Sequence, residues 1–140
     1  NGYLLQARAL MALGRFDEVQ EPARRAVRLA TLARDATRVS AAYATAAEAS
    51  LMSGEDAQAY DLAQRAIAER PSNAAAHAVL AAASALSGRE TEAAAEMAVY
   101  RKLAPQATIA NYDEFRPSRN PVYLAQRERL FEGLRKAGLP

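Results

Sequence analysis

The 140-residue sequence contains no cysteine, no tryptophan and only one histidine. The absence of cysteine excludes disulfide scaffolds, thiolate zinc sites and cysteine nucleophiles. A histidine-based metal site would need carboxylates near His77, but the neighbouring residues in the sequence are alanines. Packing alone must therefore stabilise the fold, and we assign no catalytic, metal-binding or cofactor-binding residue.

Long hydrophobic runs and strongly charged segments are also absent. No stretch approaches 18 uninterrupted apolar residues, so we expect a cytoplasmic protein without a membrane partner. The net charge is +2, and Arg24, Arg25 and Arg28 share their segment with acidic residues. This mixture favours a solvated helix face, and we expect no nucleic-acid partner. The chain begins with Asn1 rather than Met, which suggests a fragment of a longer polypeptide.

What the sequence has in excess is alanine, which supplies about a quarter of all residues. Alanine is the best helix-forming residue, and its small side chain allows helices to approach closely. The composition therefore predicts an all-α fold of tightly packed helices.

An internal repeat organises the chain. Gly54 and Gly88 are 34 positions apart, and so are Pro71 and Pro105. Tyr43 and His77 follow the same spacing. A unit of this length is typical of a helical hairpin that buries its apolar face only against neighbouring copies.

An earlier copy is visible around Gly14, which lies 40 positions before Gly54, so that this copy has about six extra residues near positions 31–38. We expect helices over residues 3–13 and 17–33, 37–52 and 56–69, and 74–86 and 90–103. The corresponding repeats are residues 1–36, 37–71 and 72–105. Residues 106–119 form an ordered linker, and residues 120–140 form a helix that caps the exposed end of the stack.

These residues resemble the tetratricopeptide repeat family. The second copy supplies Tyr43, Ala47, Gly54, Ala59, Ala66 and Pro71, the third supplies His77, Ala81, Gly88, Ala93 and Pro105, and the first supplies Tyr3, Ala7, Gly14, Phe16 and Ala26. The resemblance implies a right-handed superhelix of three hairpins. It also implies a concave face, formed mainly by the first helix of each hairpin, that binds protein.

By this alignment the concave face should carry Leu4, Arg8, Met11, Thr45, Glu48, Met52, Ala75, Ala78, Ala82 and Leu86. The basic residues with which some family members grip a chaperone carboxylate are missing. The surface suits an apolar helix or an extended segment. We therefore expect a non-catalytic protein-protein interaction or self-association module, whose partner is a protein, a peptide, its own upstream domain or a second copy. Alternatively, the groove is filled by residues 108–115 of the chain itself.

A second resemblance concerns two short segments, residues 100–105 and 133–140. They look like the tail of bacterial signalling proteins that place such repeats after a class III nucleotide cyclase domain. This resemblance implies that the chain is the C-terminal part of a larger bacterial signalling protein. The alternative function is then a regulatory tail that controls an attached cyclase or another output domain.

The remaining titratable residues do not predict an enzyme. Adjacent residues on a helix point away from each other, so Glu55 and Asp56 mark a helix start rather than an acid–base pair. Asp113 and Glu114 are expected in a solvated loop. An enzyme would need both of these, Arg116 and His77 in one pocket. We expect His77 to replace the aromatic residue of the other copies by packing alone, so that His77→Phe folds normally.

Overall fold

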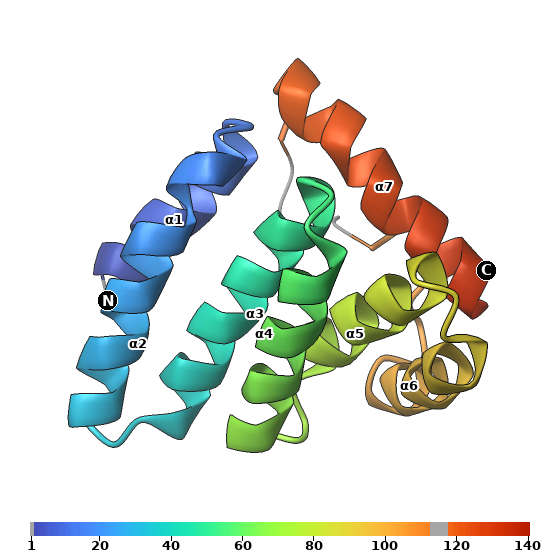
Figure 1. Cartoon of the computed structure of the whole chain (residues 1–140), viewed down its shortest axis with the longest axis horizontal. Helices are drawn as coiled ribbons and strands as arrows, with labels where there is room; N and C mark the ends of the chain where they lie inside the picture. Colours follow the sequence, from blue (N-terminus) through green and yellow to red (C-terminus); the bar gives the residue numbers. More distant parts are fainter. Residues whose placement is uncertain (1, 113–117) are drawn as a thin grey trace.

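The computed structural model describes residues 2–112 and 118–140, and every regular element within them is helical (Figure 1). The predicted all-α class is therefore confirmed. The elements are α1 (Gly2–Ala12), the 3-10 helix η1 (Phe16–Glu18), α2 (Gln20–Leu32), α3 (Ala36–Met52), α4 (Asp56–Glu69), α5 (Ala74–Leu86), α6 (Glu90–Leu103) and α7 (Pro121–Ala137).

The three glycines that define the repeat lie in equivalent turns. Gly14, Gly54 and Gly88 have φ angles of 74°, 86° and 78°, a region that other residues enter only at a cost of about 1 kcal/mol or more. Gly14 follows α1, while Gly54 joins α3 to α4 and Gly88 joins α5 to α6. The periodic glycines therefore end the first helix of each successive pair.

The start of α2 differs from the sequence-based expectation. A helix was predicted over residues 17–33, but residues 17 and 18 belong to the 3-10 turn η1 and the α-helix begins only at Gln20. Pro22 is consequently the third residue of α2, where the backbone N–H would have no partner within the helix. The proline therefore costs no helical hydrogen bond.

The helices pack in chain order. α1 packs on α2, α3 on α4 and α5 on α6, while α2 also covers α3 and α4 also covers α5. α3 further contacts both α1 and α5. As a result α3 and α5 are buried on almost every side, with residues such as Ala47 and Ala81 fully inaccessible. The alanine content explains how helices pack so closely around these two.

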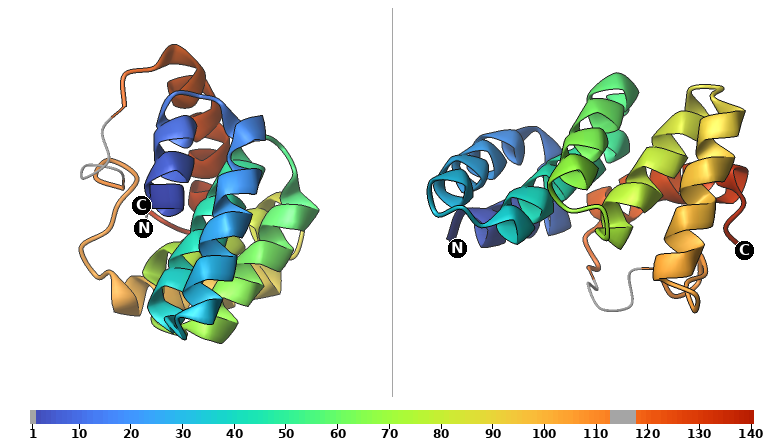
Figure 2. Two further views of the ribbon diagram at one scale, coloured as in Figure 1. Left: turned by 90° about the vertical axis from the view of Figure 1, so that its left-hand side faces the viewer. Right: turned by 90° about the horizontal axis from the view of Figure 1, so that it is seen from below.

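The position of α7 corrects the expectation that the last helix caps the end of the stack. α7 contacts α5 most extensively and also contacts α3 and α6 (Figures 1 and 2). Just before it, Ser118 Oγ donates to the carbonyl oxygen of Ala12 at 2.6 Å. After it, Gly138 lies against Met97 of α6. α7 therefore runs along the molecule from the end of α1 to α6.

Two contacts fix the middle of α7. Arg129 donates to the carbonyl oxygen of Leu51 at 3.1 Å and forms an ion pair with Asp56, at the turn between α3 and α4. Gly133 lies so close to α5 that an added Cβ would be 2.8 Å from the Cβ of Ala82. Leu130 and Leu134 beside these contacts are buried in the main core. α7 is thus an integral part of the core.

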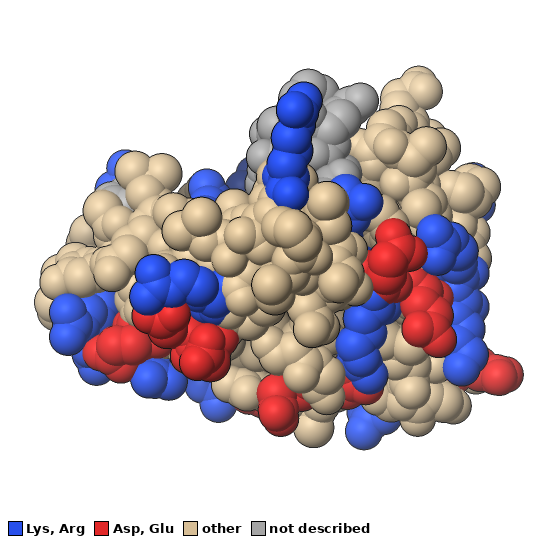
Figure 3. All heavy atoms as spheres, turned by 90° about the horizontal axis from the view of Figure 1, so that it is seen from above, with Lys and Arg blue, Asp and Glu red and all other residues tan. Residues whose placement is uncertain are grey.

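The surface carries charges of both signs. On the face seen in Figure 3, Lys and Arg side chains are interspersed with Asp and Glu side chains, with a broad uncharged area between the groups. In the part of the chain that the structure describes, no helix combines the length and the hydrophobicity that crossing a bilayer requires.

Candidate functional site

A hollow of about 300 Å³ opens between α1, α3 and the connection from α4 to α5. We call it the inter-hairpin hollow because each of the three helical pairs contributes to it. It is lined by Arg8, Ala41, Ala44, Thr45, Glu48, Arg70, Asn73 and Ala75. A ligand bound there would contact all three pairs at once.

A chain of hydrogen bonds builds one side of this hollow. The Asn73 side chain accepts from the backbone N–H of Ala76 at 3.2 Å and so caps the start of α5. Its Nδ2 donates to Ser40 Oγ at 2.8 Å, and Ser40 Oγ in turn donates to the carbonyl oxygen of Ala66 at 2.7 Å. Asn73 is therefore fixed in place by α3, α4 and α5 before any ligand arrives.

The floor of the hollow consists of small residues on α3. Ala44 and Thr45 are buried, and Thr45 Oγ1 donates to the carbonyl oxygen of Ala41 at 3.0 Å, one helical turn earlier. The threonine hydroxyl is thus used within its own helix. Alanine side chains are short and leave space above the floor. The hollow therefore exists mainly because these positions carry no larger side chains.

The rim carries the charge. Arg8 and Arg70 are exposed at the rim, whereas Glu48 is buried. Arg70 directly follows α4 in an extended backbone conformation, with φ −146° and ψ 97°, as expected for a residue before proline. Within the described residues Arg70 forms no ion pair. Its guanidinium group has the planar geometry that binds a carboxylate through two parallel hydrogen bonds.

The structure places the predicted concave-face residues in two different environments. Arg8, Thr45, Glu48 and Ala75 line the inter-hairpin hollow. The other predicted residues are partly or fully buried, namely Leu4, Met11, Met52, Ala78, Ala82 and Leu86.

The prediction that methionines line an accessible apolar groove is therefore wrong. Met52 is fully inaccessible and Met11 is only 4% exposed, because both belong to the main core. Ala82 is covered by α7 at Gly133. Leu4 packs in a smaller cluster with Ala26 and Ala42. An apolar ligand cannot reach these side chains.

Sequence reasoning missed Arg70 and Asn73. Both lie in the connection between α4 and α5, whereas the alignment considered only the first helix of each pair. The sequence did contain a signal for an ordered connection, because Arg70 precedes Pro71 and Asn73 precedes a run of alanines. In the structure Asn73 caps α5 and donates to Ser40 of α3, which places this connection beside α3.

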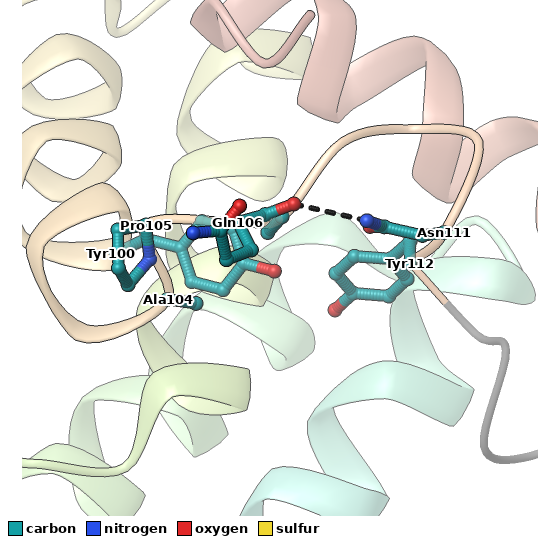
Figure 4. Close-up of a pocket in the computed structure, with 7 residues that line it drawn as sticks. Tyr100, Ala104, Pro105, Gln106, Asn111 and Tyr112 are labelled. Carbon is teal, nitrogen blue, oxygen red and sulfur yellow. Dashed lines mark hydrogen bonds between the residues drawn. The ribbon is translucent and has the colours of Figure 1, made fainter.

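A second hollow, of about 320 Å³, lies where residues 104–112 fold back on the end of α6 (Figure 4). Tyr100 and Tyr112 flank it, with ring centroids 6.3 Å apart. Asn111 Nδ2 donates to the carbonyl oxygen of Gln106 at 2.9 Å, and its backbone N–H donates to Thr108 Oγ1. These bonds within the segment account for its shape without a ligand.

The same segment bears on the alternative that residues 108–115 fill the groove. Tyr112 packs edge-on against Phe131 of α7, and the backbone N–H of Ile109 donates to the carbonyl oxygen of Pro140. Residues 108–112 therefore lie against α6, α7 and the last residue. Residues 113–115 lie outside the described residues.

His77 has the carboxylate neighbour that its sequence context lacks. Its Nδ1 lies 2.5 Å from Oε2 of Glu96 on α6, and its Nε2 lies 2.7 Å from the carbonyl oxygen of Pro71. The expectation that His77 acts by packing alone is therefore incomplete. The ring links α5 to α6 and to the preceding connection through polar contacts at both nitrogens.

Three further residues were considered for catalysis together with His77. Asp113, Glu114 and Arg116 lie outside the described residues. Across residues 2–112 and 118–140, no cluster of three or more histidine or acidic side chains could hold a metal ion. Comparisons with protein-family models, with curated proteins and with solved structures each found no match to this chain.

Proposed function

We propose that this chain is a non-catalytic protein-binding module of three tetratricopeptide-like hairpins that form a superhelix. The inter-hairpin hollow binds an acidic side chain of an extended partner segment. The observation that carries this proposal is the exposed guanidinium of Arg70 at the rim of a hollow to which all three helical pairs contribute.

The serial packing supports the assignment to hairpin repeats. In both junctions between successive pairs, the second helix of one pair packs on the first helix of the next: α2 packs on α3, and α4 packs on α5. The 34-residue spacing of Gly54 and Gly88 corresponds to one such step. In repeat proteins of this kind, successive first helices line the face that binds ligands.

The size and charge of the hollow support an acidic ligand. A volume near 300 Å³ is at the lower end of the range for ligand sites, about 300–1,000 Å³, and it accommodates one or two side chains rather than a helix. Two arginines, Arg8 and Arg70, and one glutamate, Glu48, line the hollow, so its formal net charge is positive. A negatively charged carboxylate on the ligand complements this positive charge.

Site-specific photo-crosslinking tests the proposal. A photoreactive residue at Ala75, inside the hollow, should capture a polypeptide from an extract of the source cells, and Arg70→Glu in the same protein should abolish capture. A photoreactive residue at the exposed Ala98 of α6 should not capture the same polypeptide. Arg101→Glu, which makes the same charge change on α6, is the matched control and should leave capture intact. Capture that survives Arg70→Glu would contradict the proposed site.

A further inference from the structure

His77 occupies a position at which the three helical pairs differ. When the turn glycines are aligned, His77 corresponds to Tyr3 and Tyr43. Each of these tyrosines meets an arginine on the second helix of its own pair. The Arg25 guanidinium lies 5.5 Å from the centre of the Tyr3 ring, and hydrogen bonding to Tyr43 raises the pKa of the Arg65 guanidinium. Tyrosine and arginine keep their charges between about pH 5 and pH 8, so these two links do not respond to pH in that range.

The third pair replaces this link with one that can gain or lose a proton. Val99 stands at the position of the two arginines, and the ring of His77 instead contacts Glu96 on α6. Nδ1 of His77 lies 2.5 Å from Oε2 of Glu96, and Nε2 lies 2.7 Å from the carbonyl oxygen of Pro71. Both ring nitrogens therefore face an oxygen atom, in a residue that is only 6% exposed. Histidine is the residue type whose charge ordinarily changes between about pH 5 and pH 8.

The two contacts of the ring require two hydrogens. A carbonyl oxygen only accepts, so Nε2 carries a hydrogen that it donates to Pro71. At 2.5 Å, Nδ1 and Oε2 of Glu96 share a second hydrogen, whichever of the two atoms carries it. When that hydrogen is lost, a ring nitrogen and a carboxylate oxygen face each other with lone pairs only. The ring then has a single N–H for two acceptors, so one of the two contacts breaks.

Glu96 is the charged partner of the ring within the described residues. α3, α4 and α7 also pack on α5, but no hydrogen bond or ion pair joins the His77 side chain to the described residues of these helices. Glu69 and Arg70, at the C-terminal end of α4, are both exposed. Glu92, one turn before Glu96 on α6, contacts α4 instead. The hydrogen shared with Glu96 therefore decides whether the ring keeps both of its contacts.

The contact with Pro71 acts on the connection that forms the rim of the inter-hairpin hollow. Pro71 lies between Arg70 and Asn73, and both of these residues line the hollow. The Asn73 side chain ties this connection to α3, and the backbone N–H of Arg70 ties it to α4. Neither of these hydrogen bonds involves a group that titrates near neutral pH. The tie from His77 to Pro71 is the one that depends on a hydrogen at the ring.

We infer that His77 is a positioning residue for Arg70, which holds the rim of the hollow in place only while the ring is bound to both Glu96 and Pro71. This inference rests on the proposed function, in which Arg70 binds an acidic side chain. At the acidic end of the range the site carries both hydrogens, and α6 is tied to the connection beside Arg70. As the pH rises and the shared hydrogen is lost, this tie breaks and an acidic ligand binds more weakly.

An NMR titration between about pH 5 and pH 8 tests the positioning role without a ligand. His77 is the only histidine of the chain, so its ring signals need no assignment. The backbone amide signal of Arg70 should shift with the same midpoint as the ring. In Glu96→Gln this shift should fall to less than half, because a glutamine amide can donate to a neutral Nδ1 while Nε2 keeps its contact with Pro71.

Glu92→Gln is the matched control, because Glu92 is a half-exposed glutamate on the same helix. This variant should behave as the wild type does. The inference is overturned if the ring does not titrate in this range or if the Arg70 amide does not follow the ring. It is also overturned if the Arg70 amide of Glu96→Gln shifts as far as that of the wild type.

Binding of a fluorescein-labelled hexaglutamate peptide, followed by fluorescence anisotropy, tests the consequence for the hollow. Glutamate side chains stay ionised between about pH 6 and pH 8, so the acidic side chains of the probe keep their charge. The affinity of the wild type should fall about fivefold across this range, the equivalent of one ordinary hydrogen bond. Glu96→Gln should remove this dependence, and Glu92→Gln should keep it. Arg70→Glu should abolish binding at both ends of the range.

The two experiments separate this inference from the proposed function. Peptide binding that requires Arg70 but does not change with pH would overturn the inference and leave the proposed function intact. If the peptide does not bind, or binds Arg70→Glu equally well, the proposed function is contradicted. The NMR titration then decides on its own whether His77 positions Arg70.

Discussion

Arg129 of α7 and Asp56 at the start of α4 form an ion pair through two hydrogen bonds. Nη2 of Arg129 donates to Oδ2 of Asp56 at 2.8 Å, and Nη1 donates to Oδ1. The hydrogen bonding to Asp56 raises the pKa of the Arg129 guanidinium. Nη1 also donates to the carbonyl oxygen of Leu51. One side chain thus joins the last helix to the turn of the second helical pair.

Replacing this arginine should destabilise the protein. Arg129→Met keeps most of the apolar stem but leaves Asp56 and the carbonyl of Leu51 without this partner, which should lower the free energy of unfolding by about 1–3 kcal/mol. Urea denaturation measures the change. Arg135→Met is the matched control, because Arg135 is half exposed and lies 3.9 Å from Glu128, and its loss should cost less than about 1 kcal/mol. Equal effects of the two variants would show that the ion pair does not hold α7.

Gly133→Ala should also destabilise the protein, although helix propensity alone predicts the opposite. In an isolated helix, alanine is more stable than glycine by about 1 kcal/mol. At Gly133 an added Cβ would lie 2.8 Å from Ala82 Cβ and 2.9 Å from the carbonyl oxygen of Ala82. The backbone of α5 cannot move aside, so we expect a net loss of about 1–3 kcal/mol. Thermal unfolding of Gly133→Ala should therefore show a lower midpoint.

Gly2→Ala is the control for this prediction. Gly2 lies at the start of α1, and an added Cβ would meet no atom within 4 Å. This substitution should leave the midpoint unchanged or raise it. A midpoint for Gly133→Ala that is equal to or above that of the wild type would contradict the close contact between α5 and α7.

His77→Phe should be destabilising, in contrast to the expectation from the sequence. Phenylalanine keeps the ring but leaves the carbonyl oxygen of Pro71 and the carboxylate of Glu96 without their nitrogen partners, at a cost of about 1–3 kcal/mol. Tyr43→Phe, 34 positions earlier, also keeps a ring and should change the free energy by less than about 0.5 kcal/mol. If guanidinium denaturation gives the same midpoint for both variants, His77 acts by packing alone.

The ion pair between Arg15, which precedes η1, and Glu18, its last residue, predicts a pH-dependent signal. Hydrogen bonds from the Arg15 guanidinium, at 2.5 Å, lower the pKa of the Glu18 carboxyl. Because the folded pKa is lowered, the contribution of this pair is complete above the ordinary glutamate pKa. It is lost as the pH falls through the lowered value. An NMR titration of Glu18 should show this lower midpoint, and Arg15→Gln should restore an ordinary one.

Features that depend on local sequence were predictable. The periodic glycines predicted the three turns, because a positive φ is a local requirement, and the alanine content predicted the helices. Arg34, within the segment where the sequence predicts extra residues in the first copy, adopts a positive φ of 54° between α2 and α3. Helix ends and turns follow from residues that are close in sequence.

Features that depend on contacts between distant residues were not predictable. The apolar residues Tyr123, Leu130 and Leu134 indicate that the last helix packs on other helices. They do not indicate that Arg129 meets Asp56, 73 positions away. The contact between His77 and Glu96 likewise depends on how α5 and α6 pack, so the sequence did not predict it. The hollow beside Arg70 required the relative placement of three helical pairs. A sequence pattern identifies which side of a helix is buried, whereas it does not identify the partner.

NMR spectroscopy can test most directly whether α7 spans all three helical pairs. The structure predicts two nuclear Overhauser effects in the same protein. One joins the Gly14 Hα protons to the Val122 methyl groups, and the other joins the Gly133 Hα protons to the Ala82 methyl group. Observation of both would confirm that α7 runs from the first pair to the third. Contacts of α7 with α6 and none with Gly14 would contradict this arrangement and show that α7 is an end cap.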